Sequence, residues 1–342
     1  MAKKIVKLGT IAALSLVASA GASLATDLKI SVWGGGYAEK FEKHIVQPFE
    51  EETGISITLD GGRSTERLSK LIATRGRGAD LMIISDFQMF EASKRGLLQP
   101  VDRANIPNID RLYDFAQDPI GGGMCPAFTV VAAGIAYNKD HYETAPTSWG
   151  QLLDGSSKAK SGYPDIALSY GIPSLILFSE MNGGSIDDLA PGIKAIQEAK
   201  DDLHFFGGRD VLESINMGDV SIAPHLNIFV KKDPEATIQF TWPEEGALGL
   251  RNMICVVKGS KEAEAAEKFI NYFISADVQA KWLEVSGDEP VNKDVDMSKA
   301  DELPLNLLGK EALEKANFWP IDKIIAKKPE WVSMWQEEVI AN

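Results

Sequence analysis

The stretch ISVWGGGYAEKF at residues 30–41 places an aromatic ring beside unusually bare main chain. An apolar run ends at Trp33, the glycines Gly34, Gly35 and Gly36 follow, and a helical pattern begins at Tyr37. A tight turn needs one or two glycines, whereas three in a row let another molecule approach the backbone closely. The amides can donate hydrogen bonds to an anionic group, and the indole can cover methylenes or an ammonium. These residue types favour binding of a small ligand, although Trp33 is also compatible with simple packing.

Two arginines follow glycine pairs, and they are candidates for binding an acidic group. Arg63 stands in DGGRS and Arg209 stands in FFGGRD. A guanidinium binds carboxylate or phosphate oxygens through parallel hydrogen bonds. Arg63 can instead pair with Asp60 or Glu66, and Arg209 can pair with the aspartate that follows it. Arg251, beside a long apolar run, is a third candidate with weaker support.

Further polar and aromatic residues fall at predicted strand ends or in loops. Asp86 follows Ser85 after an apolar run, and it can either bind an ammonium or cap the next helix. His225 in APHLN is either a satisfied buried histidine or a neutral hydrogen-bond donor. Trp242 before PEEG is more often a packing residue than part of a ligand wall. The remaining candidate ligand contacts are Ser64, Phe87, Ser169, Tyr170 and Asn227.

The alternation of apolar runs and amphipathic stretches predicts an α/β fold. Strands are expected at 28–33, 55–60 and 80–85, and helices at 37–54, 65–76 and 87–96. This order is typical of a parallel sheet that helices cover on both faces, and ligands bind beyond the carboxyl ends of its strands. Trp33, Arg63 and Ser85 fall at those ends.

The second half of the chain continues the alternation. Long apolar runs at 128–138 and 251–259 predict strands long enough to join two lobes that each contain a sheet. Shorter strands are expected at 165–169 and 220–224. Helices are expected at 173–184, 185–200, 210–218 and 261–275, and another from 148.

The first residues indicate export. Three lysines among the first seven residues precede an apolar stretch at 8–18, and small residues lead to a cleavage site before Thr26. This pattern is typical of a secretory signal peptide at residues 1–25, because the apolar stretch is too short to span a membrane. The mature chain is therefore expected to be soluble and periplasmic.

The charge of the chain restricts its partners. The formal net charge of the 342 residues is −14, and the expected signal peptide carries only positive charge, so the mature protein is more acidic still. Such a protein repels nucleic acid and anionic lipid, and neither is expected as a partner. The four histidines show no metal-ligand spacing and only two cysteines are present. No metal and no cofactor are expected.

Short segments along nearly the whole expected mature chain share one family pattern. They are VWGGGYAEKF, ADLMIISDFQMFEASKRGLLQPVD, GIAYNKD, APTSWGQLLD, MGDVSIAPHLN, WPEEGALGLRNMICVVKGSKEAEAAEKFINYFISADVQAKW and GDEPVNKDV. Each is weakly specific alone. Together and in this order they resemble the periplasmic solute-binding proteins of ABC importers, in the spermidine/putrescine-binding group.

The resemblance implies a fold and a role. The fold is the periplasmic-binding-protein type, with two α/β lobes joined by a hinge and a ligand cleft between them. Lobe 1 is expected at residues 26–134 plus 257–300, lobe 2 at 138–252, and C-terminal helices packing on the lobes at 301–342. The resemblance further implies a monomeric, non-enzymatic protein that binds a small polar solute and docks on an ABC permease in the inner membrane.

The resemblance does not transfer the ligand. In polyamine-binding members, acidic side chains hold the ammonium groups and aromatic rings hold the methylenes. This chain has Gly171, Ser174 and Asn252 at three acidic positions, and Leu226 and Leu250 at two tryptophan positions. A buried arginine without an anion is costly, as is a buried ammonium without a carboxylate. Compared with the polyamine-binding members, this chain lacks these acids and has additional arginines. This difference favours an anionic or zwitterionic ligand, such as γ-aminobutyrate, an amino acid or an amino-phosphonate. Polyamine binding is the alternative.

The two cysteines leave several alternatives open. Cys125 and Cys255 fall at the starts of the two expected hinge strands. They can form a disulfide in an oxidising compartment or remain buried thiols. Thiaminase I is similar in fold and has a nucleophilic cysteine in a stretch similar to that of Cys125, which makes an enzyme the alternative of another class. No histidine or glutamate can be placed beside Cys125 from the sequence.

Overall fold

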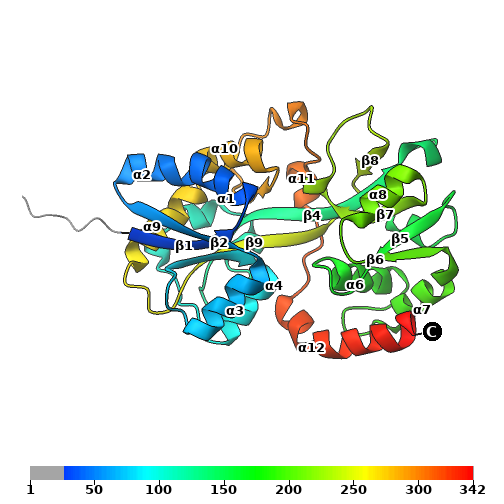
Figure 1. The fold of residues 1–342 in the computed structure, drawn as a ribbon, viewed down its shortest axis with the longest axis horizontal. Helices are drawn as coiled ribbons and strands as arrows, with labels where there is room; N and C mark the ends of the chain where they lie inside the picture. Colours follow the sequence, from blue (N-terminus) through cyan, green and yellow to red (C-terminus); the bar gives the residue numbers. More distant parts are fainter. Residues whose placement is uncertain (1–26, 342) are drawn as a thin grey trace, which may run out of the picture.

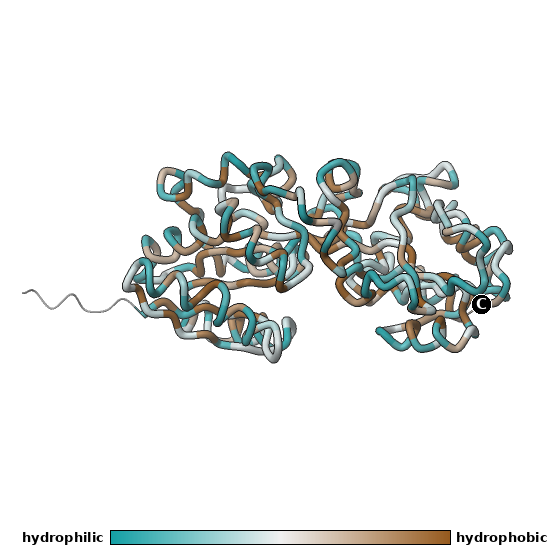
Figure 2. The backbone as a smooth tube through the Cα atoms, turned by 90° about the horizontal axis from the view of Figure 1, so that it is seen from above, coloured by the Kyte–Doolittle hydropathy of each residue, from teal (hydrophilic) through white to brown (hydrophobic). Residues whose placement is uncertain are grey.

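The computed structural model describes residues 27–341. Within them the chain forms two lobes along the long axis of the molecule, each with strands and packed helices (Figure 1). In this range the strands of both lobes belong to one continuous ten-stranded sheet. Apolar segments concentrate inside each lobe and along the connection between the lobes, and hydrophilic segments surround them (Figure 2). The expected signal peptide at 1–25 lies outside the described residues.

The strands are β1 (Asp27–Trp33), β2 (Ser56–Gly62), β3 (Leu81–Ser85), β4 (Ala127–Asn138), β5 (Lys160–Pro164), β6 (Leu203–Phe206), β7 (Val220–Leu226), β8 (Ile238–Thr241), β9 (Leu248–Val256) and β10 (Glu289–Pro290). The α-helices are α1 (Gly36–Phe41), α2 (Gln47–Thr53), α3 (Ser64–Thr74), α4 (Asp86–Lys94), α5 (Asp114–Gln117), α6 (Gly171–Met181), α7 (Ala190–Glu198), α8 (Asp210–Met217), α9 (Ala263–Phe273), α10 (Ala276–Ser286), α11 (Gly309–Glu314) and α12 (Ile321–Met334). Two π-helical turns, η1 (Glu42–Val46) and η9 (Trp335–Ile340), extend helices.

Lobe 1 is built on a parallel sheet. β2, β1 and β3 are parallel neighbours, and β9 runs antiparallel to β3. α1, α2 and α10 lie on one side of this sheet, and α3 and α4 lie on the other (Figure 1). α1, η1 and α2 follow one another directly, and Gly54 ends this helix in the left-handed conformation with φ 71°. Phe41, Ile45 and Phe49 are fully buried along it, as their four-residue spacing predicts.

Lobe 2 has a second parallel group of strands. β6, β5 and β7 are parallel neighbours, and β7 runs antiparallel to β4. α6 is buried from Gly171 to Ser179 and is the central packing helix of this lobe. A Cβ at Gly171 would lie 2.2 Å from the main-chain oxygen of Asp165, so only glycine allows this close approach.

β4 and β9 pair with each other and belong to both lobes. In lobe 1, Asn252 of β9 lies opposite Ser85 at the carboxyl end of β3. In lobe 2, Ala133 of β4 lies opposite Leu226 at the carboxyl end of β7. The carboxyl ends of the parallel strands in the two lobes therefore face each other across this crossing.

The C-terminal part of the chain adds a third connection between the lobes. Leu308 and Leu313 pack in the buried cluster of lobe 1. Ile324, Trp331 and Trp335 pack in the buried cluster of lobe 2. The division into 26–134 plus 257–300 and 138–252 stays a proposal, since the two buried clusters meet within β4 and β9.

The observed elements differ from the sequence prediction in lobe 2. The prediction of a strand at 165–169 is wrong, because β5 ends at Pro164 and residues 165–169 form a turn. The Asp165 carboxylate instead accepts a hydrogen bond from the Ala167 amide at 2.8 Å, which stabilises the turn. The helix expected at 185–200 is shorter, at Ala190–Glu198. The prediction also missed β6 and β8, which are four residues each.

Cys125 and Cys255 form a disulfide in the structure. It links the chain just before β4 to β9 across a sequence separation of 130 residues. Both cysteines are buried, with exposed fractions of 1% and 0%. The disulfide leaves no thiolate at Cys125, which a thiaminase-like reaction would need.

Replacing both cysteines by serine should lower the free energy of unfolding by about 2–4 kcal/mol, because the disulfide restricts the unfolded chain. Urea unfolding followed by tryptophan fluorescence measures this loss. The parent protein denatured with dithiothreitol and refolded in it is the matched control, and it should unfold at the same urea concentration as the double variant. Equal unfolding midpoints for the oxidised parent and the double variant would contradict the expectation.

Candidate functional site

The glycines after Trp33 have separate roles in the structure. A Cβ on Gly34 would lie 3.2 Å from the main-chain nitrogen of Gly62, because the ends of β1 and β2 approach each other closely. Gly35 has a φ of 63°, a conformation that residues with a side chain rarely adopt. Gly36 faces open space. Packing between strands therefore explains Gly34, and the open space at Gly35 and Gly36 is compatible with approach of a ligand.

Trp33 is half-buried at the end of β1, and its ring is held on several sides. Its Nε1 donates a hydrogen bond to Ser64 Oγ at 2.8 Å. The ring of Tyr37 contacts it edge-on, with centroids 5.0 Å apart. The guanidinium carbon of Arg67 lies 5.6 Å from the centre of the indole. The indole therefore has a fixed orientation at the edge of lobe 1.

Arg67 on α3 is a buried arginine at this edge that the sequence analysis missed. Its Nε donates to the Gly62 carbonyl at 3.1 Å and its Nη1 donates to the Ile83 carbonyl at 2.7 Å. Burial lowers the pKa of Arg67 to about 10, so its guanidinium remains charged at neutral pH. The DGG sequence before α3 was the available signal, because a Cβ at Gly62 would lie 3.3 Å from Arg67 Cγ.

Arg63, by contrast, is exposed at the start of α3. Its main-chain amide donates to Glu66 Oε2 at 3.4 Å. Asp60, a possible partner of Arg63 in the sequence analysis, instead forms an ion pair with Lys70 at 2.7 Å. Arg63 therefore stays a candidate ligand contact.

Tyr37 has a buried hydroxyl without a hydrogen-bond partner among the described residues. Its ring lies 5.2 Å from the ring of Trp282, centroid to centroid. Burial raises the pKa of Tyr37 well above its usual value, and the negative charge of Asp288 adds to this effect. The hydroxyl therefore stays protonated and is able to donate a hydrogen bond.

Asp86 and Arg251 bind each other. Arg251 Nε donates to Asp86 Oδ2 at 3.0 Å, and the two side chains are only 3% and 9% exposed. The guanidinium of Arg251 also lies 5.1 Å from the centre of the Phe318 ring. Burial raises the pKa of Asp86, and Arg251 opposes that shift. The sequence analysis assigned these charges to the two ends of a ligand, whereas the structure pairs them at the crossing of the lobes.

His225 lies at the end of β7, on the edge of lobe 2. It is 1% exposed, and its Nδ1 lies 3.4 Å from the Leu226 carbonyl oxygen. Burial lowers the pKa of His225 to about 4, so the ring is neutral at pH 7. Since a carbonyl only accepts, Nδ1 carries the hydrogen and Nε2 has a lone pair. Nε2 has no partner among the described residues, which gives it an acceptor role in place of the expected donor role.

Arg209 and Phe229 extend the edge of lobe 2 beside His225. The guanidinium carbon of Arg209 lies 4.9 Å from the centre of the Phe229 ring. Phe229 is 41% exposed, and its ring centroid lies 5.7 Å from that of His225. Tyr170, buried before α6, also lies near His225, at 6.3 Å between ring centroids. The sequence analysis missed Phe229, since an apolar residue in APHLNIF gives no sign of exposure.

A cavity of about 160 Å³ joins residues of the two lobes. Ser85 and Phe87 line it from the edge of lobe 1, and Ser169 lines it from the turn after β5. Ile324 and Lys328 of α12 close one side. The structure therefore brings together three of the residues that the sequence analysis selected.

Two other predicted ligand contacts use their polar groups within the protein. Asn227 accepts a hydrogen bond from the Ala132 amide at 3.2 Å and donates to the Asn306 carbonyl at 3.0 Å. Trp242 Nε1 donates to the Leu307 carbonyl at 3.0 Å. Asn227 therefore holds β4 and the C-terminal segment together, and Trp242 holds the C-terminal segment.

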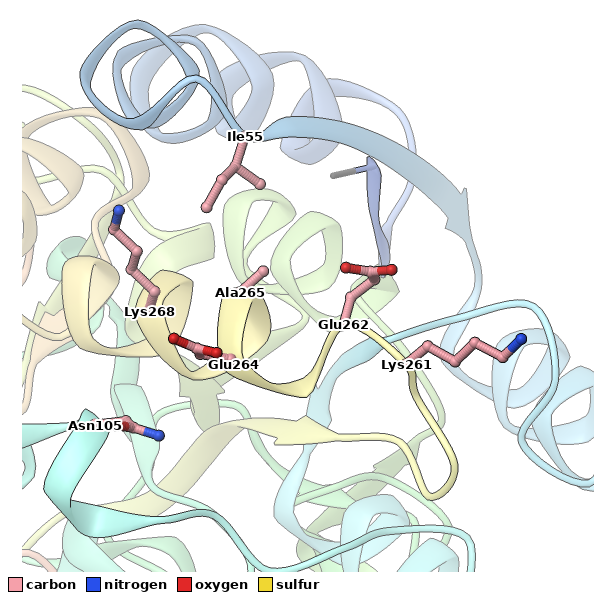
Figure 3. Close-up of a pocket in the computed structure, with 7 residues that line it drawn as sticks. All are labelled: Ile55, Asn105, Lys261, Glu262, Glu264, Ala265 and Lys268. Carbon is pink, nitrogen blue, oxygen red and sulfur yellow. The ribbon is translucent and has the colours of Figure 1, made fainter. Parts of the chain in front are cut away.

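A larger hollow of about 490 Å³ lies on the surface of lobe 1 (Figure 3). Ile55 before β2 and the first residues of α9 line it, together with Lys261 and Glu262. Ile55 lies at the amino end of β2, whereas the cleft lies at the carboxyl ends of the strands. This hollow is therefore distinct from the region between the lobes.

Residues 44–304 match the family described as bacterial extracellular solute-binding protein. The chain belongs to this family. The spermidine/putrescine-binding periplasmic protein 1 of Haemophilus influenzae is 22% identical over 304 residues, covering 86% of this chain and 81% of that protein. The putative 2-aminoethylphosphonate-binding periplasmic protein of Salmonella typhi is 26% identical over 282 residues, covering 72% and 73% of the two chains.

Solved structures show the same fold. The crystal structure of an ABC transporter from Clostridium perfringens has a TM-score of 0.82 at 23% identity, covering 91% of this chain and 99% of that chain. A GABA receptor structure has a TM-score of 0.72 at 21% identity, covering 91% and 96%. The predicted family resemblance and the two-lobe α/β periplasmic-binding-protein fold are confirmed.

No helix within residues 27–341 is both long and apolar enough to cross a membrane. In the same range, no three or more histidine, cysteine, aspartate or glutamate side chains are arranged to hold a metal ion.

Replacing Asp86 by alanine should lower the free energy of unfolding by about 3–5 kcal/mol, because Arg251 would remain buried without a counter-ion. The double variant Asp86→Ala/Arg251→Met removes both charges, and we expect it to recover most of this loss in urea unfolding. Asp60→Ala is the matched control, since its partner Lys70 is exposed, and it should cost less than about 1 kcal/mol. If Asp86→Ala is as stable as the parent, the ion pair contributes little to the free energy of unfolding.

Proposed function

We propose that this protein is a periplasmic receptor that captures a small solute carrying both an amine and an acidic group. It delivers that solute to an ABC permease in the inner membrane. Zwitterions such as γ-aminobutyrate, another amino acid or an amino-phosphonate are the favoured solutes. The protein binds and releases the solute unchanged and is not an enzyme.

The arrangement of Arg209 and His225 on the edge of lobe 2 carries this proposal. Arg209 offers a positive charge, and His225 beside it offers a buried lone pair on Nε2 without a partner. A buried polar atom without a hydrogen bond is costly, and a ligand that supplies the bond recovers this free energy. A solute with an anionic oxygen for Arg209 and an N–H or O–H group for His225 satisfies both side chains.

The hinge geometry supports capture between the lobes. The end of β3 with Ser85 faces the end of β7 with His225 across β4 and β9, and Trp33 ends the neighbouring strand β1. In parallel sheets, ligands bind at such carboxyl ends. Exposed Phe229 and half-buried Trp33 supply one aromatic ring from each lobe, and closure of the lobes would cover the methylenes of the solute with them.

The names of related proteins agree with an amine-containing solute. They include spermidine, putrescine, 2-aminoethylphosphonate and GABA. All four compounds contain an amine, and the last two also contain an acidic group. These names support the chemical class, while the choice of a zwitterion rests on Arg209.

Polyamine binding is the second candidate, and it is favoured by the spermidine/putrescine-binding relative. A polyamine has several ammonium groups, and each one requires a carboxylate or an aromatic ring when buried. Asp86, at the strand end of lobe 1, already neutralises Arg251. This pairing and the cation of Arg209 make a purely cationic solute the weaker candidate.

Arg209→Ala should weaken binding of γ-aminobutyrate or 2-aminoethylphosphonate roughly tenfold to hundredfold, because a charge-assisted hydrogen bond contributes about 1.5–3 kcal/mol. Isothermal titration calorimetry measures the change, with Arg63→Ala as the second variant. Arg103→Ala is the matched control, since Arg103 forms an ion pair with Asp110 in lobe 1. If Arg209→Ala and Arg63→Ala both bind as tightly as the parent, neither arginine anchors the solute.

Protein purified under native conditions should release a small molecule that contains both an amine and an acidic group. Extraction followed by mass spectrometry identifies it, and the protein heated and refolded without solute serves as the blank. A di- or polyamine without any acidic group in this extract would instead establish the second candidate.

A further inference from the structure

Asp288 is a buried carboxylate whose hydrogen-bond partners are neutral. It is 5% exposed, and its Oδ2 accepts long hydrogen bonds from Trp282 Nε1 at 3.3 Å and Thr129 Oγ1 at 3.4 Å. No lysine or arginine among residues 27–341 forms an ion pair with it. The nearby cation is Lys40, which is exposed and donates to the Val285 carbonyl at 2.8 Å. Buried charges are normally paired, so this carboxylate lacks a counter-ion.

Asp288 lies at the edge of lobe 1 that faces lobe 2. It immediately precedes β10, which pairs with β4 at Thr129 and Val130. Thr129 Oγ1 in turn accepts a hydrogen bond from Asn252 Nδ2 at 3.0 Å, and Asn252 lies opposite Ser85 at the end of β3. The Thr129 hydroxyl therefore links the Asp288 carboxylate to Asn252.

The surroundings of Asp288 suit an ammonium group. The ring of Tyr37 lies between those of Trp33 and Trp282, at 5.0 and 5.2 Å between centroids. The Tyr37 hydroxyl is buried without a partner, and the charges of Tyr37 and Asp288 influence each other. A carboxylate, aromatic rings and a hydroxyl are the groups that bind ammonium in proteins.

The ionisation of Asp288 is consistent with a missing cation. Burial raises the pKa of Asp288 to about 6, and the hydrogen bonds from Trp282 and Thr129 only partly oppose this. The group is still ionised above pH 7, where it remains a buried negative charge. An ammonium beside it would remove the cost of this charge.

We propose that Asp288 binds the amine of the solute, the role that the sequence analysis gave to Asp86. Asp86 is already neutralised by Arg251, whereas Asp288 has no counter-ion. The inference rests on the proposed function and specifies where the two ends of the solute bind. The acidic end binds lobe 2 at Arg209, and the amine binds lobe 1 at Asp288, so that the solute holds the two lobes together.

Asp288→Asn tests this assignment, because the amide keeps the shape and an acceptor oxygen but removes the charge. The probes are γ-aminobutyrate, 2-aminoethylphosphonate and putrescine, titrated by calorimetry at pH 7.5. We expect each probe that binds the parent to bind Asp288→Asn roughly tenfold to hundredfold more weakly. The melting temperature without solute should not fall, because an unpaired buried charge has been removed.

Glu289→Gln is the matched control, because it removes the neighbouring buried charge. Glu289 accepts hydrogen bonds from the amides of Leu308 and Gly309 at 3.0 and 2.9 Å, so its carboxylate is already satisfied. Glu289→Gln should lower the melting temperature, since one of these amides loses its acceptor, and it should keep the affinity of the parent. The two variants thus separate loss of binding from loss of stability.

Each other outcome overturns a distinct statement. If a probe binds the parent and Asp288→Asn equally well, Asp288 does not bind the amine, and the proposed function stands. If Asp288→Asn melts below the parent without solute, its carboxylate is a structural acceptor for Trp282 and Thr129, and the inference fails. If none of the three probes binds the parent, γ-aminobutyrate and 2-aminoethylphosphonate are not its solutes, and the inference that Asp288 binds their amine is wrong.

Discussion

The antiparallel pairing of β4 with β9 is the constraint on which the rest of the structure depends. Because β9 also pairs with β3 of lobe 1 and β4 also pairs with β7 of lobe 2, the pairing fixes which strand ends meet. The carboxyl ends of β3 and β7 approach it from opposite sides, so the polar residues after these strands face one another. The disulfide between Cys125 and Cys255 holds the two strands together on the side of lobe 1.

Polar groups near this crossing fall into two classes. Asp86 with Arg251, and Asn227 with the main chain, have their hydrogen bonds within the protein and hold the hinge region in a defined arrangement. His225 Nε2 and the Tyr37 hydroxyl are buried without partners, and Asp288 is buried without a counter-ion. Unsatisfied groups are costly, and a solute of complementary chemistry bound between the lobes can relieve these three.

Much of the fold follows from periodicity in the sequence. The order of strands and helices in lobe 1 and the long strand β4 were predictable because their apolar patterns are long and regular. The turn at 165–169 was mistaken for a strand because the middle of DIALS is apolar, whereas the Asp165 side chain stabilises a turn there. β6 and β8 were missed because four residues carry too little pattern.

The candidate site was less predictable because charge partners are set by tertiary contacts. Sequence reasoning selected Trp33 and Ser85 from their places at strand ends, and the ends of β3 and β7 do face each other. It selected Arg209 from the glycines before it and His225 from the segment APHLN. It could not show that Arg251 binds Asp86 over a separation of 165 residues. Arg67 appeared to be an ordinary helix-surface residue in TERLSKL, and Asp288 appeared to be an ordinary loop residue in GDEP.

The division of the chain between the lobes also determines how the protein can fold. The core of lobe 1 contains Leu28 and Leu313, and the core of lobe 2 contains Val131 and Val339. Neither core can form until segments that are far apart in the chain have come together. Such non-local contacts make folding slow, because loop closure must precede the gain from burial. A chain interrupted before α12 would leave apolar residues of lobe 2 uncovered, so α12 and η9 are needed to complete its native state.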